Sequence, residues 1–288
     1  TKISKKNNII DIAKNKKKIN TLAPYKLVKT MRAGVLVLGS LLTKYGNAKV
    51  SLPGGCAIGT RPVDLHLFAL KRLGAKIKIK DGYIFADARN GLKGALINFP
   101  SISVGATENA LLAAANANGK SIIKNCAIEP EIIDLIVFLR KLGTTINLKG
   151  RTITISKNKI NNNKIIHKVI FDRIELGTYM IASALLAKRV IINKVNPKIV
   201  KSELDILKKI GVKTKINKSS IIITRGKRLK KINIVTKPYP GFPTDLQAQL
   251  MVLLTQANGI SKIRENIFEN RFMHVPELKR MGAKIEIK

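Results

Sequence analysis

The sequence predicts an α/β fold built from repeated units of helix, strand, helix and hairpin. A phrase combining an apolar residue, a glycine and strand-forming residues recurs about every 70 residues. The four copies read LGAKI, LGTTI, IGVKTKI and MGAKIEI, beginning at Leu73, Leu142, Ile210 and Met281. Helically spaced apolar residues precede each copy, and alternating runs typical of strands follow the first three. Repetition at this interval indicates stacked supersecondary units.

The helix before each phrase is expected to end at the glycine of the phrase. In DLHLFALKRLG, residues 64–74, apolar side chains recur at near-helical intervals and basic residues fill the last turn. A glycine after the last apolar residue favours a left-handed helix cap. The runs KIKIKDGYIFADA, TINLKGRTITIS and KTKINKSSIIIT are predicted to be hairpins, and the final AKIEIK is predicted to be part of a strand.

A second helix in each unit is rich in small residues, and a strand-like run follows it. These helices contain VLVLGSLLTKYG, ENALLAAANANG, LGTYMIASALLAK and LQAQLMVLLTQANG. Small side chains let helix backbones approach closely, so we expect these helices to pack against one another beneath the sheets. The residues before Ala33 match only the hairpin of a preceding unit, KISKKNNIIDIA. The chain therefore contains four helix pairs and part of a fifth unit.

Composition narrows the class of protein. Hydrophobic residues make up 45% of 288, and no apolar run reaches about 18 residues, so a globular protein without a membrane span is expected. The net charge of +37 would attract anionic substrates. The lysines are scattered along the sequence and do not gather in one block or on one helix face. Lysine, asparagine and isoleucine are abundant together and tryptophan is absent, which indicates an AT-rich coding background that raises the number of lysines on solvated surfaces. Nucleic acid is therefore not expected as a partner, although a basic nucleic-acid-binding module stays an alternative.

The cysteines and the chain ends predict the compartment and the extent of the protein. Cys56 and Cys126 are too few for a disulfide framework, and no signal peptide opens the chain, so a cytoplasmic location is expected. The chain begins without methionine and stops within AKIEIK, so we expect a fragment lacking both ends.

The first loop with candidate chemistry is PGGCAIGTRPVDLH, residues 53–66. Two glycines before Cys56 permit close approach of a ligand. A thiol near Arg61 and a helix start can have a lowered pKa and exchange a proton, and the arginine can bind phosphate or carboxylate. A buried structural cysteine is the alternative for a lone thiol. Cys126 lacks such a setting and is interpreted as structural.

Three further loops occupy equivalent places in the repeats. YPGFPTDLQAQ presents Asp245 on a rigid turn, either as a helix-capping residue or as a general base, with Thr244 as a candidate N-cap. SISVGATENA can seat an anion on the N–H groups of a helix start, with Ser103 or Thr107 equally compatible with capping. ENIFENRFMHVPEL carries Arg271, a candidate anion-binding or acid-pairing residue. Arg32 occupies the corresponding place in the first unit.

Metal and nucleotide cofactors are not expected. His66, His167 and His274 do not have zinc-ligand spacing, and the two cysteines do not form a CxxC pair. The sequence contains neither a dinucleotide-binding fingerprint nor a P-loop.

These loops resemble the enolpyruvyl transferase family, and within it the UDP-N-acetylglucosamine 1-carboxyvinyltransferases. The matching phrases stand in family order along nearly the whole chain: APYKLVKTMRAG, SLPGGCAIGTRPVDLHL, SVGATENALLAAA, FDRIELGTYMIASA, PYPGFPTDLQAQLM and ENIFENRFMHVPELKRMGAKIEI. The resemblance implies an inside-out α/β barrel of βαβαββ units in two domains, here residues 1–170 and 171–288. It also implies transfer of the enolpyruvyl group of phosphoenolpyruvate to the 3′-hydroxyl of UDP-N-acetylglucosamine with release of phosphate, the first committed step of peptidoglycan precursor synthesis.

The resemblance also assigns residue roles. Cys56 would be the general acid and the site of fosfomycin alkylation and of a pyruvate adduct, and Asp245 would be the general base. Arg32 and Arg61 would neutralise substrate charge, and Asp172 and Arg271 would support domain closure. The residues implied to bind substrate are Arg32, Arg61, Pro62, Val63, Asp64, Leu65, Ser101, Ile102, Ser103, Val104, Gly105, Asp245, Ile267 and Arg271.

The sequence departs from the family pattern in two respects. Ser101 stands where many relatives have a lysine. The N-terminal lysine–asparagine pair and the C-terminal closing arginine of the family have no counterpart, so the fragment is expected to be poorly active. A 3-phosphoshikimate 1-carboxyvinyltransferase-like enzyme is the nearest alternative, although that family does not use this cysteine, and an inactive scaffold of the same fold is another.

Overall fold

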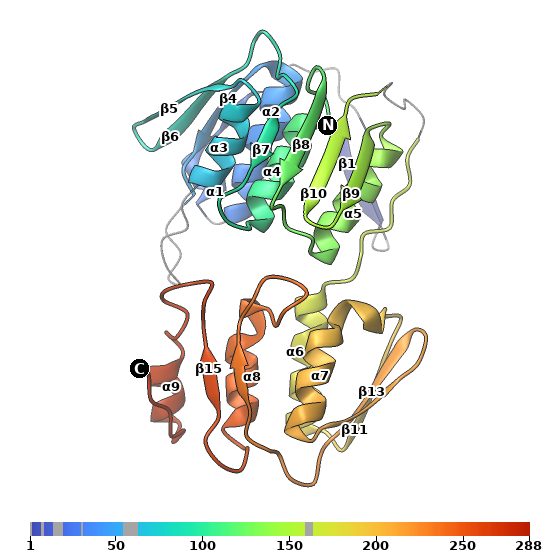
Figure 1. The fold of residues 1–288 in the computed structure, drawn as a ribbon, viewed down its shortest axis with the longest axis vertical. Coiled ribbons are helices and arrows are strands. Elements are labelled where there is room, and N and C mark those ends of the chain that lie inside the picture. The colour runs from blue at the N-terminus through green and yellow to red at the C-terminus, as the bar shows by residue number, and fades with distance from the viewer. Residues whose placement is uncertain (1, 7–8, 14–19, 30, 54–62, 159–163) are drawn as a thin grey trace.

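The computed structural model covers residues 1–288 and describes all of them except 1, 7–8, 14–19, 30, 54–62 and 159–163. The described chain forms two lobes (Figure 1). Residues up to Ser156 build the first lobe, and residues from Arg173 onward build the second. Each lobe has its own hydrophobic core, because the buried residues between Val28 and Ile155 form one cluster and those between Leu176 and Leu254 form another.

The first lobe contains two complete units with the same order of elements. The first unit consists of β3 (Leu22–Ala23), α1 (Tyr25–Val28), η1 (Arg32–Leu36), α2 (Val37–Tyr45), β4 (Asn47–Ser51), α3 (Asp64–Arg72), β5 (Lys76–Lys80) and β6 (Tyr83–Asp87). The second consists of β7 (Leu96–Asn98), α4 (Val104–Ala114), β8 (Lys120–Lys124), α5 (Pro130–Lys141), β9 (Thr145–Lys149) and β10 (Thr152–Ser156). Both follow the order βαβαββ, as the resemblance implied.

The sheets of these two units have identical topology. The strand orders are β3-β4-β6-β5 and β7-β8-β10-β9. The first two strands of each sheet are parallel, as the connecting helix requires, and the other neighbours are antiparallel. Hairpin registers such as Ile77↔Ala86 and Ile146↔Ile155 place β-branched and small residues on the core face. The predicted hairpins are confirmed.

The second lobe continues the pattern. The third unit of the chain lies in this lobe and contains α6 (Arg173–Leu186), β11 (Arg189–Asn193), η2 (Pro197–Val200), α7 (Lys201–Ile210), β12 (Lys213–Ile216) and β13 (Ser220–Thr224). Its fourth contains β14 (Asn233–Val235), η3 (Thr244–Leu246), α8 (Gln247–Leu254), β15 (Lys262–Arg264) and α9 (Val275–Arg280). The strand order β11-β13-β12 is antiparallel, whereas β14 and β15 pair in parallel.

Two expectations for the chain ends need correction. The segment before Ala33 is more than a hairpin, because β3 and α1 follow the antiparallel pair β1 (Lys2–Lys6) and β2 (Ile9–Ala13). The final AKIEIK is not a strand in the structure, since residues 283–288 have no regular secondary structure. A strand needs a neighbour to complete its ladder of hydrogen bonds, and no described strand pairs with this segment.

The glycines of the repeated phrase end their helices as predicted. Gly74, Gly143, Gly211 and Gly282 have φ values of 95°, 103°, 100° and 93°. This left-handed conformation is readily available to glycine and reverses the chain from each helix into the segment that follows. The same local device therefore recurs in all four units.

The small-residue helices pack together inside each lobe, as the sequence predicted. In the first lobe, α2 and α3 both contact α4. Gly39 on α2 lies so close to α4 that a Cβ atom would stand 2.7 Å from the backbone oxygen of Asn109. The Gly39 N–H donates a 2.8 Å hydrogen bond to Asn109 Oδ1, and Asn109 Nδ2 donates to Val35 O at 3.2 Å. In the second lobe, a Cβ at Gly177 would meet Leu246 at the start of α8. Among the described helices, none is both long and apolar enough to cross a membrane.

Substituting Gly39 by Ala is expected to destabilise the first lobe strongly. The added methyl group would overlap the Asn109 backbone, which cannot move without separating α2 from α4. Overpacking of this kind costs about 1–3 kcal/mol or more in the free energy of unfolding. Urea unfolding followed by circular dichroism measures the change. The control is Ser40→Ala on the exposed face of the same helix, expected to stay within about 0.5 kcal/mol; equal effects of the two substitutions would contradict the packing argument.

Candidate functional site

Asp245 lies in η3, immediately before the small-residue helix α8. The buried side chains of Leu246 and Phe242 anchor the turn on the core of the second lobe. Arg271 Nη2 donates a 2.5 Å hydrogen bond to Asp245 Oδ1. The Asp245 side chain is 52% exposed and that of Arg271 is 15% exposed. The carboxylate thus combines a fixed orientation with access for a reacting group, which a general base requires.

Arg271 is itself held by its own segment. Its guanidinium lies 5.6 Å from the centre of the Phe268 ring. Burial, and then the charge of Arg271, lowers the pKa of His274, so this imidazole tends to be neutral. Of the two roles that the sequence left open for Arg271, anion binding or pairing with an acid, the structure shows the pairing, and the acid is Asp245. Ile267, which the resemblance placed in the substrate pocket, is partly exposed on the same segment.

Glu265 connects the Asp245 turn with the Arg271 segment by hydrogen bonds, a role that the sequence did not predict. Its Oε2 accepts a 2.8 Å hydrogen bond from Thr244 Oγ1. Its Oε1 accepts from the backbone N–H groups of Ile267 and Phe268 at 2.8 and 3.2 Å. The expectation that Thr244 caps the helix is wrong, because its hydroxyl donates to Glu265. Pro243 occupies the N-cap position of η3, and Leu246 occupies that of α8. The signal in the sequence was an acid directly after a strand, where it can reach N–H groups two and three residues ahead.

The starts of α3 and α4 lie side by side in the first lobe. A Cβ added to Gly105 would stand 3.1 Å from Cε1 of His66, which is buried on α3. Ser103 is the N-cap of α4, where its hydroxyl oxygen accepts a 3.3 Å hydrogen bond from the Ala106 N–H. Thr107 instead donates to Ser103 O and accepts from the Ala127 N–H. The capping alternative is therefore realised by Ser103.

Eight of the described residues that the resemblance implied to bind substrate fall into two neighbouring groups at these helix starts. One group precedes or opens α3 and the other precedes or opens α4; the members are Val63, Asp64 and Leu65, and Ser101, Ile102, Ser103, Val104 and Gly105. Asp64 and Ser101 are exposed, whereas Val63 is buried. Adjacent helix N-termini present N–H groups and positive dipole ends, which favour an anion.

Three predicted site residues, Cys56, Arg61 and Pro62, belong to residues 54–62 and lie outside the part of the chain that the structure describes. Arg32 begins η1, at the place in its unit that the sequence predicted. Cys126 is fully buried, and burial raises the pKa of its thiol to about 11, which agrees with a structural role. Among the described residues, no group of three or more histidine, cysteine or acidic side chains could hold a metal ion.

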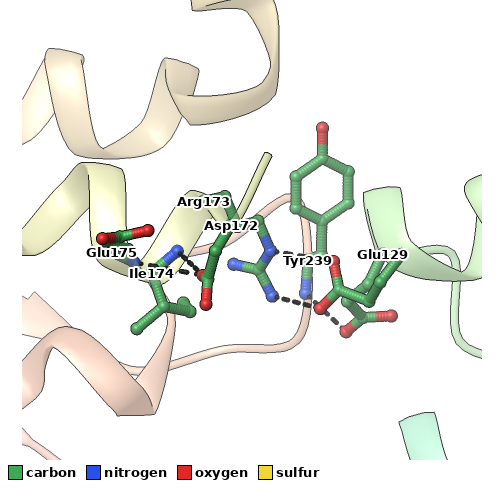
Figure 2. A network of polar contacts seen from close by, with 7 residues as sticks. Glu129, Asp172, Arg173, Ile174, Glu175 and Tyr239 are labelled. Atoms are coloured by element: carbon green, nitrogen blue, oxygen red, sulfur yellow. Dashed lines mark hydrogen bonds and ion pairs between the residues drawn. The ribbon is translucent and has the colours of Figure 1, made fainter. Parts of the chain in front are cut away.

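A polar network joins the two lobes and was not found from the sequence (Figure 2). Arg173, at the start of α6, pairs with Glu131 at the start of α5, with N···O distances of 3.2 and 3.3 Å. The Arg173 guanidinium also lies 5.6 Å from the centre of the Tyr239 ring. Asp172 caps α6 by accepting from the N–H groups of Ile174 and Glu175 at 2.7 and 3.1 Å. In the sequence, Glu131 resembled an ordinary helix-start residue, whereas the resemblance had assigned Asp172 to domain closure.

Glu108 on α4 adds a pH-sensitive group close to this network. Burial, followed by the charges of Glu131 and Glu129, raises the pKa of Glu108 to about 7. The folded protein therefore holds a proton on Glu108 between about pH 4.5 and 7 that the unfolded chain has released. This difference favours folding at low pH, and the advantage is lost as the pH rises toward 7.

Replacing Glu108 by Gln is expected to remove this pH dependence. At about pH 8 the variant should be more stable than the wild type by on the order of 1–2 kcal/mol, a value reduced for the partial solvent access of the carboxyl. At about pH 5 the two proteins should have nearly equal free energies of unfolding. Chemical denaturation at both pH values measures the difference. A gain of the same size at both pH values would contradict the assignment of the titration to Glu108.

The repeated βαβαββ units, the acid-bearing turn and the paired helix starts define the class of protein. The family described as EPSP synthase (3-phosphoshikimate 1-carboxyvinyltransferase) matches residues 1–288. The chain belongs to this family. Solved structures support the fold: the enolpyruvyl transferase NikO from Streptomyces tendae has a TM-score of 0.75 at 22% identity, covering 93% of this chain and 64% of that one. EPSP synthase from Acinetobacter baumannii has a TM-score of 0.56 at 19% identity, covering 80% and 54%. The predicted enolpyruvyl transferase fold is confirmed.

Curated relatives are far more similar in sequence than these structures. The UDP-N-acetylglucosamine 1-carboxyvinyltransferase of Pelagibacter ubique (strain HTCC1062) is 58% identical over 277 residues, 96% of this chain and 66% of that protein. The protein of the same name from Caulobacter sp. (strain K31) is 51% identical over 267 residues, 92% of this chain and 62% of that protein. The chain thus spans slightly less than two thirds of the length of these relatives.

Proposed function

We propose that the protein transfers the enolpyruvyl group of phosphoenolpyruvate to the 3′-hydroxyl of UDP-N-acetylglucosamine and releases phosphate. The observation that carries the proposal is the 58% identity, over 96% of the chain, to a relative named for this reaction. The geometry of the second lobe supports it, because Asp245 is accessible and oriented by Arg271. The adjacent starts of α3 and α4 offer N–H groups suited to an anionic ligand such as a diphosphate.

The proposed chemistry is an addition followed by an elimination. Cys56 gives a proton to the methylene carbon of phosphoenolpyruvate, which leaves the neighbouring carbon electrophilic. The sugar 3′-oxygen bonds to that carbon while Asp245 accepts the hydroxyl proton. The Cys56 thiolate then takes a proton back from the new methyl group while the carbon–oxygen bond to phosphate breaks, which restores the enol ether and releases phosphate. Arg32 and Arg61 neutralise substrate charge, and closure of the lobes excludes water.

The proposal also covers the domain boundary, the cellular location, the partners and the inhibitor of the protein. We propose the boundary between the two domains at residues 170 and 171, and the existence of two separate cores on either side of this segment supports it. The protein acts in the cytoplasm on phosphoenolpyruvate and the UDP-sugar, without nucleic acid or membrane as partner. Its product feeds peptidoglycan synthesis, which links the protein to cell wall biogenesis, cell shape, the cell cycle and cell division. Fosfomycin, a small epoxide, is proposed to alkylate Cys56.

A second candidate reaction is enolpyruvyl transfer to shikimate 3-phosphate, which the family description favours. Phosphate release from phosphoenolpyruvate by the complete gene product distinguishes the two. Release that depends on UDP-N-acetylglucosamine and not on shikimate 3-phosphate is expected. The reverse dependence would overturn the proposal in favour of the second reaction. If phosphate were released with neither of the two acceptors present in turn, that is, if both assays were negative, both reactions would be contradicted.

A further inference from the structure

The turn that carries Asp245 is held by side chains of the other lobe. Tyr239, which begins this turn, donates its backbone N–H to Glu129 Oε1 at 3.4 Å, and its backbone carbonyl accepts from Arg151 Nη2 at 2.6 Å. Both Glu129 and Arg151 belong to the first lobe, so both polar backbone groups of one residue are bound across the junction (Figure 2 shows Glu129 and Tyr239).

The two first-lobe groups are themselves fixed. Glu129 is 4% exposed and directly precedes α5. Arg151 lies in the turn between β9 and β10, and its Nη1 donates to Cys126 O at 3.1 Å. The Arg151 carbonyl accepts a hydrogen bond from the Cys126 N–H at 3.1 Å, so the backbone and the side chain of Arg151 both bind the backbone of Cys126. These restraints leave the guanidinium little freedom to follow Tyr239 if the turn moved.

The turn between Tyr239 and Asp245 transmits this restraint. The Lys237 N–H donates to Phe242 O at 3.0 Å, and the Gly241 N–H donates to Pro238 O at 2.9 Å. Ser202 Oγ on α7 donates to Gly241 O at 3.2 Å. A Cβ at Gly241 would stand 3.0 Å from Pro238 O, so the turn is compact as well as hydrogen-bonded. A shift at Tyr239 therefore moves the residues that lead into Asp245.

We propose that Glu129 and Arg151 are positioning residues that set the orientation of Asp245 by binding the backbone of Tyr239 across the lobe junction. The inference rests on the proposed function, in which Asp245 takes the proton of the acceptor hydroxyl. Neither residue is required to contact substrate. Displacing a base by about 1 Å lowers turnover by on the order of 10²-fold, whereas binding of a substrate held mainly elsewhere changes little.

The experiment combines amide hydrogen exchange with kinetics in the complete gene product. Arg151→Met and Glu129→Ala each remove one bond to Tyr239, while Glu129→Gln keeps an acceptor oxygen and serves as the conservative variant. Arg89→Met is the matched arginine control, because Arg89 forms an exposed ion pair with Asp87 elsewhere in the first lobe. Exchange is followed in peptides covering residues 236–246, and melting temperatures identify any variant that fails to fold.

Arg151→Met and Glu129→Ala are expected to raise exchange in residues 236–246 at least tenfold and to lower kcat by about 10–100-fold, with the KM for UDP-N-acetylglucosamine within about threefold of wild type. Glu129→Gln and Arg89→Met should stay close to wild type in both measurements.

Unchanged exchange, or faster exchange with unchanged kcat, would overturn the positioning role. An inactive wild type would instead overturn the proposed function, and exchange alone would then decide whether the two residues hold the turn. If Arg151→Met and Glu129→Ala both unfold, faster exchange in Arg151→Lys, which retains one donor, becomes the deciding result, and wild-type exchange in that variant would count against the proposal.

Discussion

Replacing Asp245 by Asn is expected to lower kcat by about 10²–10⁴-fold, the usual contribution of a general base. The amide has nearly the shape of the carboxylate, and its oxygen can still accept the hydrogen bond from Arg271. It cannot take a proton from the acceptor hydroxyl, so the loss should appear in turnover. Steady-state phosphate release by the complete gene product, with calorimetric titration of UDP-N-acetylglucosamine, separates turnover from binding.

The matched control for this substitution is Asp205→Asn, which removes an exposed carboxylate from α7 in the same lobe. It changes the net charge equally and should leave kcat within about twofold of wild type. If Asp245→Asn kept more than about a tenth of wild-type turnover, the assignment of Asp245 as the base would be wrong. If both substitutions lowered turnover equally, the effect would belong to charge and not to position.

Replacing Cys56 by Ser is expected to abolish covalent labelling by fosfomycin completely. A thiolate attacks an epoxide carbon, forms the carbon–sulfur bond and opens the ring, whose oxygen then takes up a proton. A serine hydroxyl is not ionised at neutral pH and does not react in this way. Intact-protein mass spectrometry of the labelled protein measures the stoichiometry, and the chain is well suited to it because it contains only two cysteines.

Cys126 provides the internal control for the labelling experiment. Its thiol is buried, and with a pKa of about 11 only about one thiol in 10⁴ is ionised at pH 7. Cys126→Ala should therefore still take up one fosfomycin per chain, while Cys56→Ser should take up none. Label remaining on Cys56→Ser, or missing from Cys126→Ala, would refute the assignment of the reactive thiol.

Local features of the fold could be predicted from the sequence because they depend on neighbouring residues. The phrase at Leu73 and its copies combine a helix end, a left-handed glycine and a strand start, and these are short-range effects. The final AKIEIK shows the limit of such reasoning. Its alternating pattern is typical of a strand, yet a strand forms only when another strand supplies hydrogen-bond partners, and no described strand does so here.

The candidate site shows the same difference between local features, which could be predicted, and contacts between distant segments, which could not. The sequence was sufficient to single out Asp245 and Arg271, because both stand in distinctive loops at equivalent places of the repeats. It gave no indication that Glu265 joins their two segments, or that Glu129 and Arg151 reach Tyr239 from the other lobe. Glutamates at helix starts and an arginine in a hairpin turn are common, and their usual explanation is local capping or solvation.

By itself, the sequence determined the repeated α/β units, the helix ends and the loops that carry the candidate chemistry. Only the tertiary structure decided which loops meet, which acid pairs with Arg271, and which first-lobe groups hold the Asp245 turn. The physical reason is the range of the interactions. Apolar periodicity and glycine caps act over a few residues, whereas the bonds to Tyr239 join residues 88 and 110 positions apart. Contacts at such separations exist only after both lobes have packed.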